Sequence, residues 1–297
     1  MRARQKKRQQ TRRLTIIITV VIIAISIAVG VYFVSTANGS TTLDQYDGQP
    51  ISSAVAASLQ AVSNQPYGPA ATSVMQSYVQ SYGGSQYISN GKPEVVFIGG
   101  EFCPYCAVER WAIVMALERF GNFTNLHYMT SANDEGDYAT LTFVGSSYTS
   151  SYIAFRPFEA EDRSGANLQT VPSNYSAVWS NFGSGFPFLD FENAYVIKDS
   201  LLAAPQILAG KNWTAILNDI GTSDSVGLQI REAANMITGV ICQVTNQTPA
   251  AVCTAPDIIT SSSTLSGPTQ ASLTMVAPAS PVVVQATYPP AVQRRLG

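Results

Sequence analysis

The sequence predicts a mixed α/β domain that follows an N-terminal membrane-spanning helix. Residues 14–34 carry no charged side chain and are mostly Ile, Val and Ala, which suits a helix that crosses a bilayer. Later in the chain, an apolar run at 95–98 leads into a pair of cysteines, a helical pattern and a second apolar run at 126–129. Because strand, helix and strand follow in this order, we expect a βαβ unit with two parallel strands.

Basic residues determine the expected orientation of the apolar segment. Seven of them precede any acidic residue: Arg2, Arg4, Lys6, Lys7, Arg8, Arg12 and Arg13. Such a cluster stays cytoplasmic, so the chain after residue 34 is expected outside the cell membrane, to which the helix anchors it. A cleavable signal peptide, cut near residues 35–37, is the alternative. The apolar part of a signal peptide is usually about 7–15 residues long, which favours the single-pass anchor.

The expected extracellular part of the chain is poor in charge. Of 17 Lys and Arg residues, seven lie before the apolar segment and two at 294 and 295, so eight remain between, against all 19 Asp and Glu residues. A surface of Ser, Thr, Asn, Gln and Tyr stays soluble with few ionised groups, which suggests an acidic external medium. The acidic balance argues against a basic patch, so no nucleic-acid partner is expected.

Glycosylation is compatible with this location. Five Asn-X-Ser/Thr acceptors follow the apolar segment, at Asn38, Asn122, Asn174, Asn212 and Asn246. Acceptors of this kind carry glycans on the surface of exported proteins. In a chain rich in Ser and Thr several arise by chance, so they agree with export without establishing it.

The chain divides into five regions. Two weak helical patterns, at 51–62 and 74–82, either form a stalk or pack on the domain that follows. After the last cysteine the sequence turns to Ser, Thr, Pro, Ala and Val without a period, which predicts disorder. The predicted regions are the cytoplasmic basic segment (1–13), the transmembrane helix (14–34), the linker and helical stalk (35–90), the main domain (91–256) and the tail (257–297).

Apolar patterns predict the order of elements in the main domain. The run at 95–98 lies between Pro93 and Gly99, as a buried central strand does, and the helical pattern after it ends at Gly121. The pattern changes at 131–184, which is interpreted as an insertion with two strands and a short helix. A hairpin at 188–197 and helices at 213–220 and 226–244 are expected to follow.

The motif Cys103-Pro104-Tyr105-Cys106 stands where the predicted strand meets the predicted helix. Unpaired N–H groups and the positive end of the helix dipole lower the pKa of a thiol at this position. Cys103 is therefore expected to face outward and attack, and Cys106, one turn along, to close the disulfide. Pro104 suits the first helical turn, where its missing N–H is not needed.

Other interpretations of the motif are weaker. A purely structural disulfide would close a very short loop and so stabilise the fold little. A zinc site would need further ligands, for which only His127 and the other two cysteines exist, so no metal is expected. Copper at a lone dithiol is similarly disfavoured, although soft metals bind thiolates. His127 itself lies between apolar residues and is expected to be structural rather than a catalytic base.

Cys242 and Cys253 form the second pair of cysteines, after the long C-terminal helical pattern. In an oxidising compartment, a structural disulfide is the first expectation for such a pair. The alternative is a shuttle role, in which this pair relays electrons to or from Cys103 and Cys106.

The sequence around the dithiol resembles the active site of the thioredoxin superfamily. Residues 101–106 follow an apolar strand, and the Pro-Tyr pair within them is usual in glutaredoxins. Phe97 stands where thioredoxins bury a carboxylate that assists proton transfer. Whether Glu101, which is nearer the dithiol, replaces that acid stays open.

A second match to this superfamily lies further along the chain. Gly185-Phe186-Pro187-Phe188 resembles its cis-proline loop, which precedes a hairpin strand. The resemblance implies that Pro187 is cis and faces the dithiol. It also implies that Phe186, with Pro104 and Tyr105, lines the groove where a substrate chain pairs.

More closely, residues 46–253 resemble an archaeal family of membrane-anchored, thioredoxin-like proteins of unknown function. The stretches 102–111 and 120–126 and the Cys242/Cys253 pair carry this resemblance. It implies a thioredoxin-like α/β fold with an insertion between the dithiol helix and the cis-proline strand. It implies no substrate, and no cofactor is expected.

These features together predict a thiol–disulfide oxidoreductase outside the cell. Cys103, Cys106 and Pro187 would form its catalytic site, exported proteins with thiols or disulfides would be its substrates, and an unidentified redox partner would recycle it. The alternative is a membrane-anchored binding module, in which the groove captures partner strands and the dithiol stays an inert disulfide. The reduction potential of the Cys103–Cys106 bond discriminates between the two.

Overall fold

The computed structural model describes residues 42–63, 65, 68–222 and 224–265. The predicted cytoplasmic segment, the predicted membrane span, Asn38 and most of the predicted tail lie outside these residues. The start of the predicted tail is not disordered as expected: it forms a helix, Pro256–Ser262, in which Ile258 is fully buried. Within the described ranges, no helix is both long and apolar enough to cross a membrane. The described elements belong to one unit that begins at Leu43.

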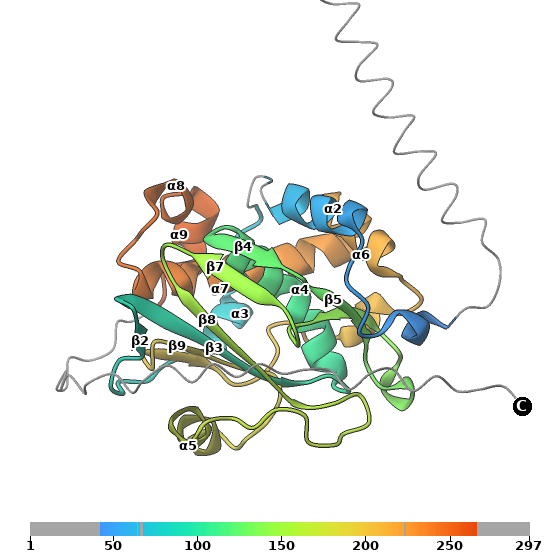
Figure 1. The fold of residues 1–297 in the computed structure, drawn as a ribbon. Helices are drawn as coiled ribbons and strands as arrows, with labels where there is room; N and C mark the ends of the chain where they lie inside the picture. Colours follow the sequence, from blue (N-terminus) through green and yellow to red (C-terminus); the bar gives the residue numbers. More distant parts are fainter. Residues whose placement is uncertain (1–41, 64, 66–67, 223, 266–297) are drawn as a thin grey trace, which may run out of the picture. The chain divides into compact units, whose positions relative to one another are not determined.

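A mixed sheet lies at the centre of this unit (Figure 1). Its central strand, β3, pairs in parallel with β8 on one side and antiparallel with β9 on the other. Beyond β9 follow β10 and β1, each antiparallel to its neighbour, and β2 pairs with the start of β3. The strands are β1 (Val79–Ser81), β2 (Ile88–Ser89), β3 (Lys92–Gly100), β8 (Ala154–Glu161), β9 (Phe188–Phe191) and β10 (Tyr195–Ile197). The predicted central strand and the predicted hairpin of β9 and β10 are thus confirmed.

The predicted parallel partner of the central strand is wrong. Residues 126–129 fall largely in β5 (His127–Thr130), which pairs antiparallel with β6 (Ala139–Thr142) in a separate two-stranded sheet. The parallel partner is β8, which lies inside the predicted insertion of 131–184. β8 pairs only with β3 among the described strands and contains Pro157, so it is an edge strand. Its mixed polar and apolar residues fit an edge and conceal its place in the main sheet.

Two small sheets, separate from the main one, lie between the dithiol helix and β8 in the chain. One consists of β5 and β6, and the other of β4 (Gly121–Thr124) and β7 (Ser147–Ser150). The predicted short helix is α5 (Ser173–Asn181), which connects β8 to β9.

Helices cover both faces of the main sheet (Figure 1). The larger hydrophobic cluster contains Val95 and Phe97 of β3 together with side chains of most helices. The smaller cluster contains Val96 and Ile98, on the face that α5 covers. The alternation follows from the geometry of a strand, in which successive side chains point to opposite faces. The remaining helices are α2 (Ser53–Ser63), α3 (Ser73–Ser77), α4 (Pro104–Glu118), α6 (Trp213–Gly221), α7 (Ser225–Val244), α8 (Ala250–Cys253) and α9 (Pro256–Ser262), with 3-10 turns η1 (Leu43–Tyr46), η2 (Asn133–Glu135) and η3 (Pro205–Leu208).

The two helical patterns before residue 90 pack on the domain. Val55, Leu59 and Val62 of α2 are buried, and α2 contacts α4 and α6. The second pattern forms α3 and continues into β1, the edge strand of the main sheet. The sequence allowed these two segments either to form a stalk or to pack on the domain, and the described residues show that they pack on it.

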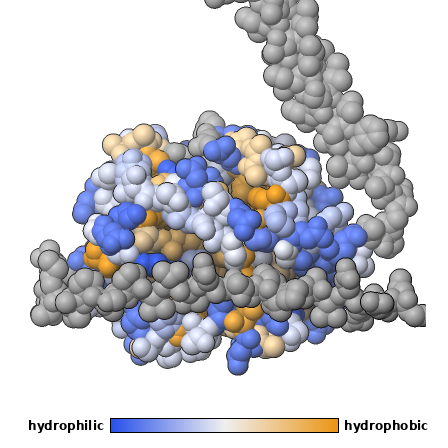
Figure 2. All heavy atoms as spheres, in the orientation of Figure 1, coloured by the Kyte–Doolittle hydropathy of each residue, from blue (hydrophilic) through white to orange (hydrophobic). Residues whose placement is uncertain are grey.

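The described surface has few hydrophobic side chains. In the view of Figure 2, hydrophilic and near-neutral residues cover most of the described surface, and strongly hydrophobic residues form small separate patches. Large hydrophobic side chains that are exposed are few among the described residues: Tyr46, Val74, Ile88, Tyr105, Leu168 and Ile259.

Cys242 and Cys253 form a disulfide that joins the end of α7 to α8. Both residues are 1 % exposed. A cross-link stabilises a fold mainly by restricting the unfolded chain, and burial keeps this bond away from a large redox partner. The expected role is therefore structural.

Replacing both residues by Ala is expected to lower the free energy of unfolding by about 3 kcal/mol, because the bond links two residues that are 11 positions apart in the chain. Chemical denaturation of the two proteins measures this difference. Thiol–disulfide exchange at Cys103 is expected to keep its rate. Loss of exchange in a variant that still folds would instead support the shuttle role.

Candidate functional site

The dithiol lies at the junction of the central strand and its following helix. Cys103 is the N-cap of α4, and Pro104 is the first residue of the helix. The backbone N–H of Cys106 donates a hydrogen bond to the Cys103 sulfur at 3.2 Å. Both cysteines are free thiols, and both are buried: Cys103 is only 6 % exposed, so it does not face outward as expected, and Cys106 has no exposed surface. The loop thus directs backbone donors of the first helical turn at one sulfur only.

The two thiols have opposite pKa shifts. The pKa of Cys103 is lowered by a hydrogen bond from the Cys106 thiol, by the backbone N–H groups of Cys106 and Tyr105 and by the Arg110 cation, against the opposing effect of burial. Burial raises the pKa of Cys106 well above its usual value. Because the thiolate is the reactive form, Cys103 is the better nucleophile and Cys106 keeps its proton.

The second predicted part of the site meets the dithiol loop through Phe186. The Phe186–Pro187 peptide bond is cis, as the resemblance implied, and the buried Pro187 directly precedes β9. The Phe186 ring lies 6.2 Å from the ring of Phe102, the residue before Cys103. On its other side Phe186 stacks on Trp179 of α5, at 5.3 Å between ring centres.

Exposure at the rim of the site differs between the aromatic residues. Phe102, Phe186 and Trp179 are partly exposed, and Tyr105 of the motif is 43 % exposed. We call Phe102, Trp179 and Phe186 the aromatic shelf. An apolar shelf beside a reactive sulfur can bind the side chains that flank a cysteine in a substrate chain.

A fully buried ion pair lies behind the dithiol. Arg110, one turn after Cys106 on α4, donates hydrogen bonds to both carboxylate oxygens of Glu159 on β8, at 2.9 and 2.6 Å. The same guanidinium donates to the backbone oxygen of Gly100 at 2.8 Å, and it lies over the Phe97 ring. Both charged side chains have no exposed surface. The pair ties the dithiol helix to both neighbouring strands, β3 and β8.

Glu101 supplies a buried acid next to the dithiol. It is 3 % exposed and accepts a hydrogen bond from the Thr142 hydroxyl at 2.7 Å. Burial raises the pKa of Glu101 to about 7, and the nearby charge of Glu159 adds to the effect. Its carboxyl group is therefore mostly uncharged in a mildly acidic medium. This position is compatible with proton transfer near the site.

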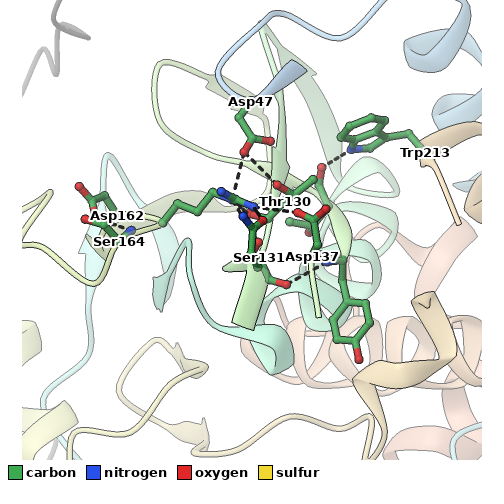
Figure 3. Close-up of polar contacts among 11 residues, drawn as sticks. Asp47, Thr130, Ser131, Asp137, Asp162, Ser164 and Trp213 are labelled. Carbon is green, nitrogen blue, oxygen red and sulfur yellow. Dashed lines mark hydrogen bonds and ion pairs between the residues drawn. The ribbon is translucent and has the colours of Figure 1, made fainter. Parts of the chain in front are cut away.

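A polar network supports the backbone beside the dithiol loop (Figure 3). The N–H of Ala132 donates to the oxygen of Phe102 at 3.0 Å, which joins the loop to the end of β5. Arg163, just after β8, donates to the backbone oxygens of Thr130 and Ser131. It also pairs with Asp47 at 3.2 Å and with Asp137 at 2.7 Å.

Sequence reasoning missed Arg110, Glu159 and Trp179. The signal for Arg110 is present, because Glu109 and Arg110 interrupt an otherwise apolar helix. Glu159 carries no such signal, since its strand mixes polar and apolar residues. His127 lies in β5 with its ring against Gly145, consistent with the structural role expected for it. Among the described residues no group of three or more His, Cys, Asp and Glu side chains could hold a metal ion.

Comparison with known proteins gives a family but no activity. No curated protein and no solved structure matches the chain at a significant level. A family model described as a domain of unknown function, DUF929, matches residues 81–243, which is more than half of the chain. The matched part includes the dithiol, the Arg110–Glu159 pair and Pro187. The chain therefore belongs to the DUF929 family.

Proposed function

We propose that this protein is a thiol–disulfide oxidoreductase with a thioredoxin-like domain, and that it acts outside the cell on exported proteins. The observation that carries the proposal is the asymmetry of its dithiol. Cys103 receives the donors of the first turn of α4, whereas Cys106 is buried and protonated. A structural disulfide has no need of this difference, while an attacking and a resolving thiol require it.

The surrounding fold supports a thioredoxin-like interpretation. The dithiol helix follows the central strand, and the loop with Pro187 precedes the antiparallel neighbour of that strand. Phe186 reaches the dithiol loop from this neighbour, as the resemblance implies for a residue of the substrate groove. The aromatic shelf supplies apolar surface on which a polypeptide substrate can lie.

The chemistry is a two-step exchange. In the reducing direction, the Cys103 thiolate attacks one sulfur of a substrate disulfide, so that a mixed disulfide forms and the second substrate sulfur leaves and takes a proton. Cys106 then loses its proton and attacks the Cys103 sulfur, which releases the first substrate sulfur as a thiolate. Two electrons pass to the substrate, and the protein ends as a disulfide. The oxidising direction reverses each step, and a second dithiol–disulfide couple restores the starting state.

The proposed location rests on the N-terminal sequence. The apolar segment of residues 14–34 and the basic residues before it would anchor the chain with its domain outside the cell. Three of the glycan acceptors, Asn122, Asn174 and Asn246, are exposed. Asn212 instead caps α6 by accepting a hydrogen bond from the N–H of Ala215 at 2.9 Å, and is less suited to modification.

Transfer of a disulfide to a reduced, unfolded protein tests the proposal. The oxidised full-length protein in detergent is mixed with the substrate, and the reaction is stopped with acid at intervals for mass spectrometry. We expect one disulfide to appear in the substrate for each Cys103–Cys106 disulfide that is lost. If that bond persists while the substrate stays reduced, and the reduced protein likewise leaves a substrate disulfide intact, the proposed function is wrong.

A further inference from the structure

We infer that Arg110, held in place by Glu159, sets the redox equilibrium of the dithiol by stabilising its reduced form, so that the protein oxidises its substrates. This inference rests on the proposed function and adds the direction in which the thiol–disulfide exchange runs. Arg110 acts through electrostatics and position, without exchanging electrons or protons itself.

Helix geometry places the Arg110 cation beside the dithiol. Residues separated by four positions lie on one face of a helix, and long side chains point back toward the helix N-terminus. Arg110 therefore extends from its own turn toward that of Cys106. Its hydrogen bond to the oxygen of Gly100, three residues before Cys103, shows where the guanidinium ends.

The Phe97 ring links the cation to the sulfur of Cys106. The Arg110 guanidinium carbon lies 5.7 Å from the centre of this ring. A Cβ atom built on Gly99 would lie 2.3 Å from Phe97 and 3.3 Å from the Cys106 sulfur, so ring and sulfur flank the same backbone position. Cation, ring and sulfur thus lie within one fully buried layer behind the dithiol, where charges interact strongly.

Arg110 retains an unused donor in this layer. Glu159 and Gly100 accept hydrogen bonds from Nε and Nη2, whereas the buried Nη1 has no hydrogen-bond partner among the described residues. Most buried N–H groups in proteins are paired, so this group lacks the acceptor that such groups usually have. A thiolate that forms at the dithiol would supply this missing acceptor.

The Arg110 cation favours the ionised form of both thiols. Arg110 lowers the pKa of both Cys103 and Cys106. Glu101, which precedes the dithiol loop, has a pKa raised to about 7 by burial and is largely uncharged below that pH. Although Glu159 neutralises the pair as a whole, the Arg110 cation therefore acts favourably on a thiolate of the reduced dithiol. Stabilising the reduced form of a dithiol makes its disulfide a stronger oxidant.

Oxidation of a substrate dithiol proceeds in two exchange steps. A substrate thiolate attacks the Cys103 sulfur of the disulfide, and Cys106 leaves and takes up a proton. The second substrate thiolate then attacks the substrate sulfur of the mixed disulfide, and Cys103 leaves as a thiolate stabilised by Arg110. The substrate loses two electrons and gains a disulfide. Another disulfide, of a protein or small thiol, must then reoxidise the dithiol.

The test compares equilibrium constants with glutathione in the full-length protein. Replacing Arg110 alone would leave Glu159 buried and unpaired and endanger folding, so the main variant is the double change Arg110→Met with Glu159→Met. We expect its dithiol to become at least about tenfold more reducing, which corresponds to about 30 mV. The pKa of Cys103, followed by thiolate absorbance, is expected to rise. Arg110→Lys, which keeps the charge, is expected to retain most of the wild-type value.

Glu109→Gln is the matched control. Glu109 is also fully buried and precedes Arg110 on α4, but it accepts hydrogen bonds from Ser200 and Leu201, away from the dithiol. Its substitution is expected to leave the equilibrium constant unchanged. An unchanged constant in the Met/Met variant, or an equal shift in both variants, would overturn the inference while the function stands. Failure of the wild-type dithiol to exchange with glutathione at all would instead overturn the proposed function.

Discussion

Replacing Cys103 by Ser is expected to reduce thiol–disulfide exchange to the uncatalysed level, whereas replacing Cys106 by Ser is expected to trap substrates as mixed disulfides. Cys103 is the sulfur with stabilising donors and residual exposure, so its loss removes the only site of attack. Cys106 is buried one turn behind it and acts only in the second step.

The expected size of the trapping effect follows from proximity. A well-oriented intramolecular group can act with an effective concentration of about 10⁵ M or more, so loss of Cys106 slows resolution by several orders of magnitude. Non-reducing gels of membranes from cells that produce the Cys106→Ser protein would show discrete adducts that dithiothreitol removes. The Cys103→Ser protein is the control and should form none. Equal adducts from both variants would assign attack to the wrong sulfur.

The second large effect concerns pH. The unfolding free energy of this domain is expected to fall as the pH rises from about 4 to about 7, because five acids have a pKa raised to about 7 by burial. They are Asp47, Glu101, Glu109, Asp190 and Glu192. Carboxyl groups in unfolded chains have pKa values near 4, so the folded protein holds these protons more tightly.

The sign follows from proton linkage. A raised pKa in the folded state stabilises the fold fully below the unfolded pKa and loses that contribution as the pH rises through the folded pKa. Each proton held only by the folded protein lowers the unfolding free energy by roughly 1.4 kcal/mol per pH unit in this window. Most proteins lose stability toward acid, so this domain is expected to behave in the opposite way, in accord with the acidic medium that its composition suggests.

Glu109→Gln isolates one of these groups. The Gln oxygen can accept the hydrogen bonds that Ser200 and Leu201 donate to Glu109 at 2.7 and 2.9 Å. We expect the variant to match the wild type near pH 4 and to gain about 3 kcal/mol relative to it by pH 8, since the Gln side chain never ionises. Urea unfolding at the two pH values measures the difference. A constant difference between wild type and variant would mean that Glu109 titrates normally.

The sequence predicts the centre of the fold better than its edges. The run at 95–98, the motif at 103–106 and the hairpin of β9 and β10 carry strong local signals, because each is short, apolar and bounded by turn residues. A strand is expected near β8, as one of the two strands of the insertion, but its Pro157 and alternating polar residues do not reveal that it pairs with β3. The packing of α2 depends on the surface of α4, which no local pattern reveals.

The candidate site likewise contains residues that the sequence predicts and residues that it does not. Cys103, Cys106 and Phe186 were predicted from motifs, and the structure brings Phe186 to the dithiol loop through Phe102. The Arg110–Glu159 pair depends on the pairing of β8 with β3, so a sequence that hides this pairing also hides the partner of Arg110.

The central claim is that Cys103 and Cys106 form a redox-active couple, and its most direct test is the reduction potential of that couple. The full-length protein is equilibrated in glutathione buffers, its thiols are trapped, and mass spectrometry follows both cysteine pairs separately. We predict that Cys103–Cys106 titrates between about −120 and −270 mV, toward the oxidising end, while Cys242–Cys253 stays oxidised. A Cys103–Cys106 potential below about −300 mV would mark an inert structural bond and would make the domain a binding module instead.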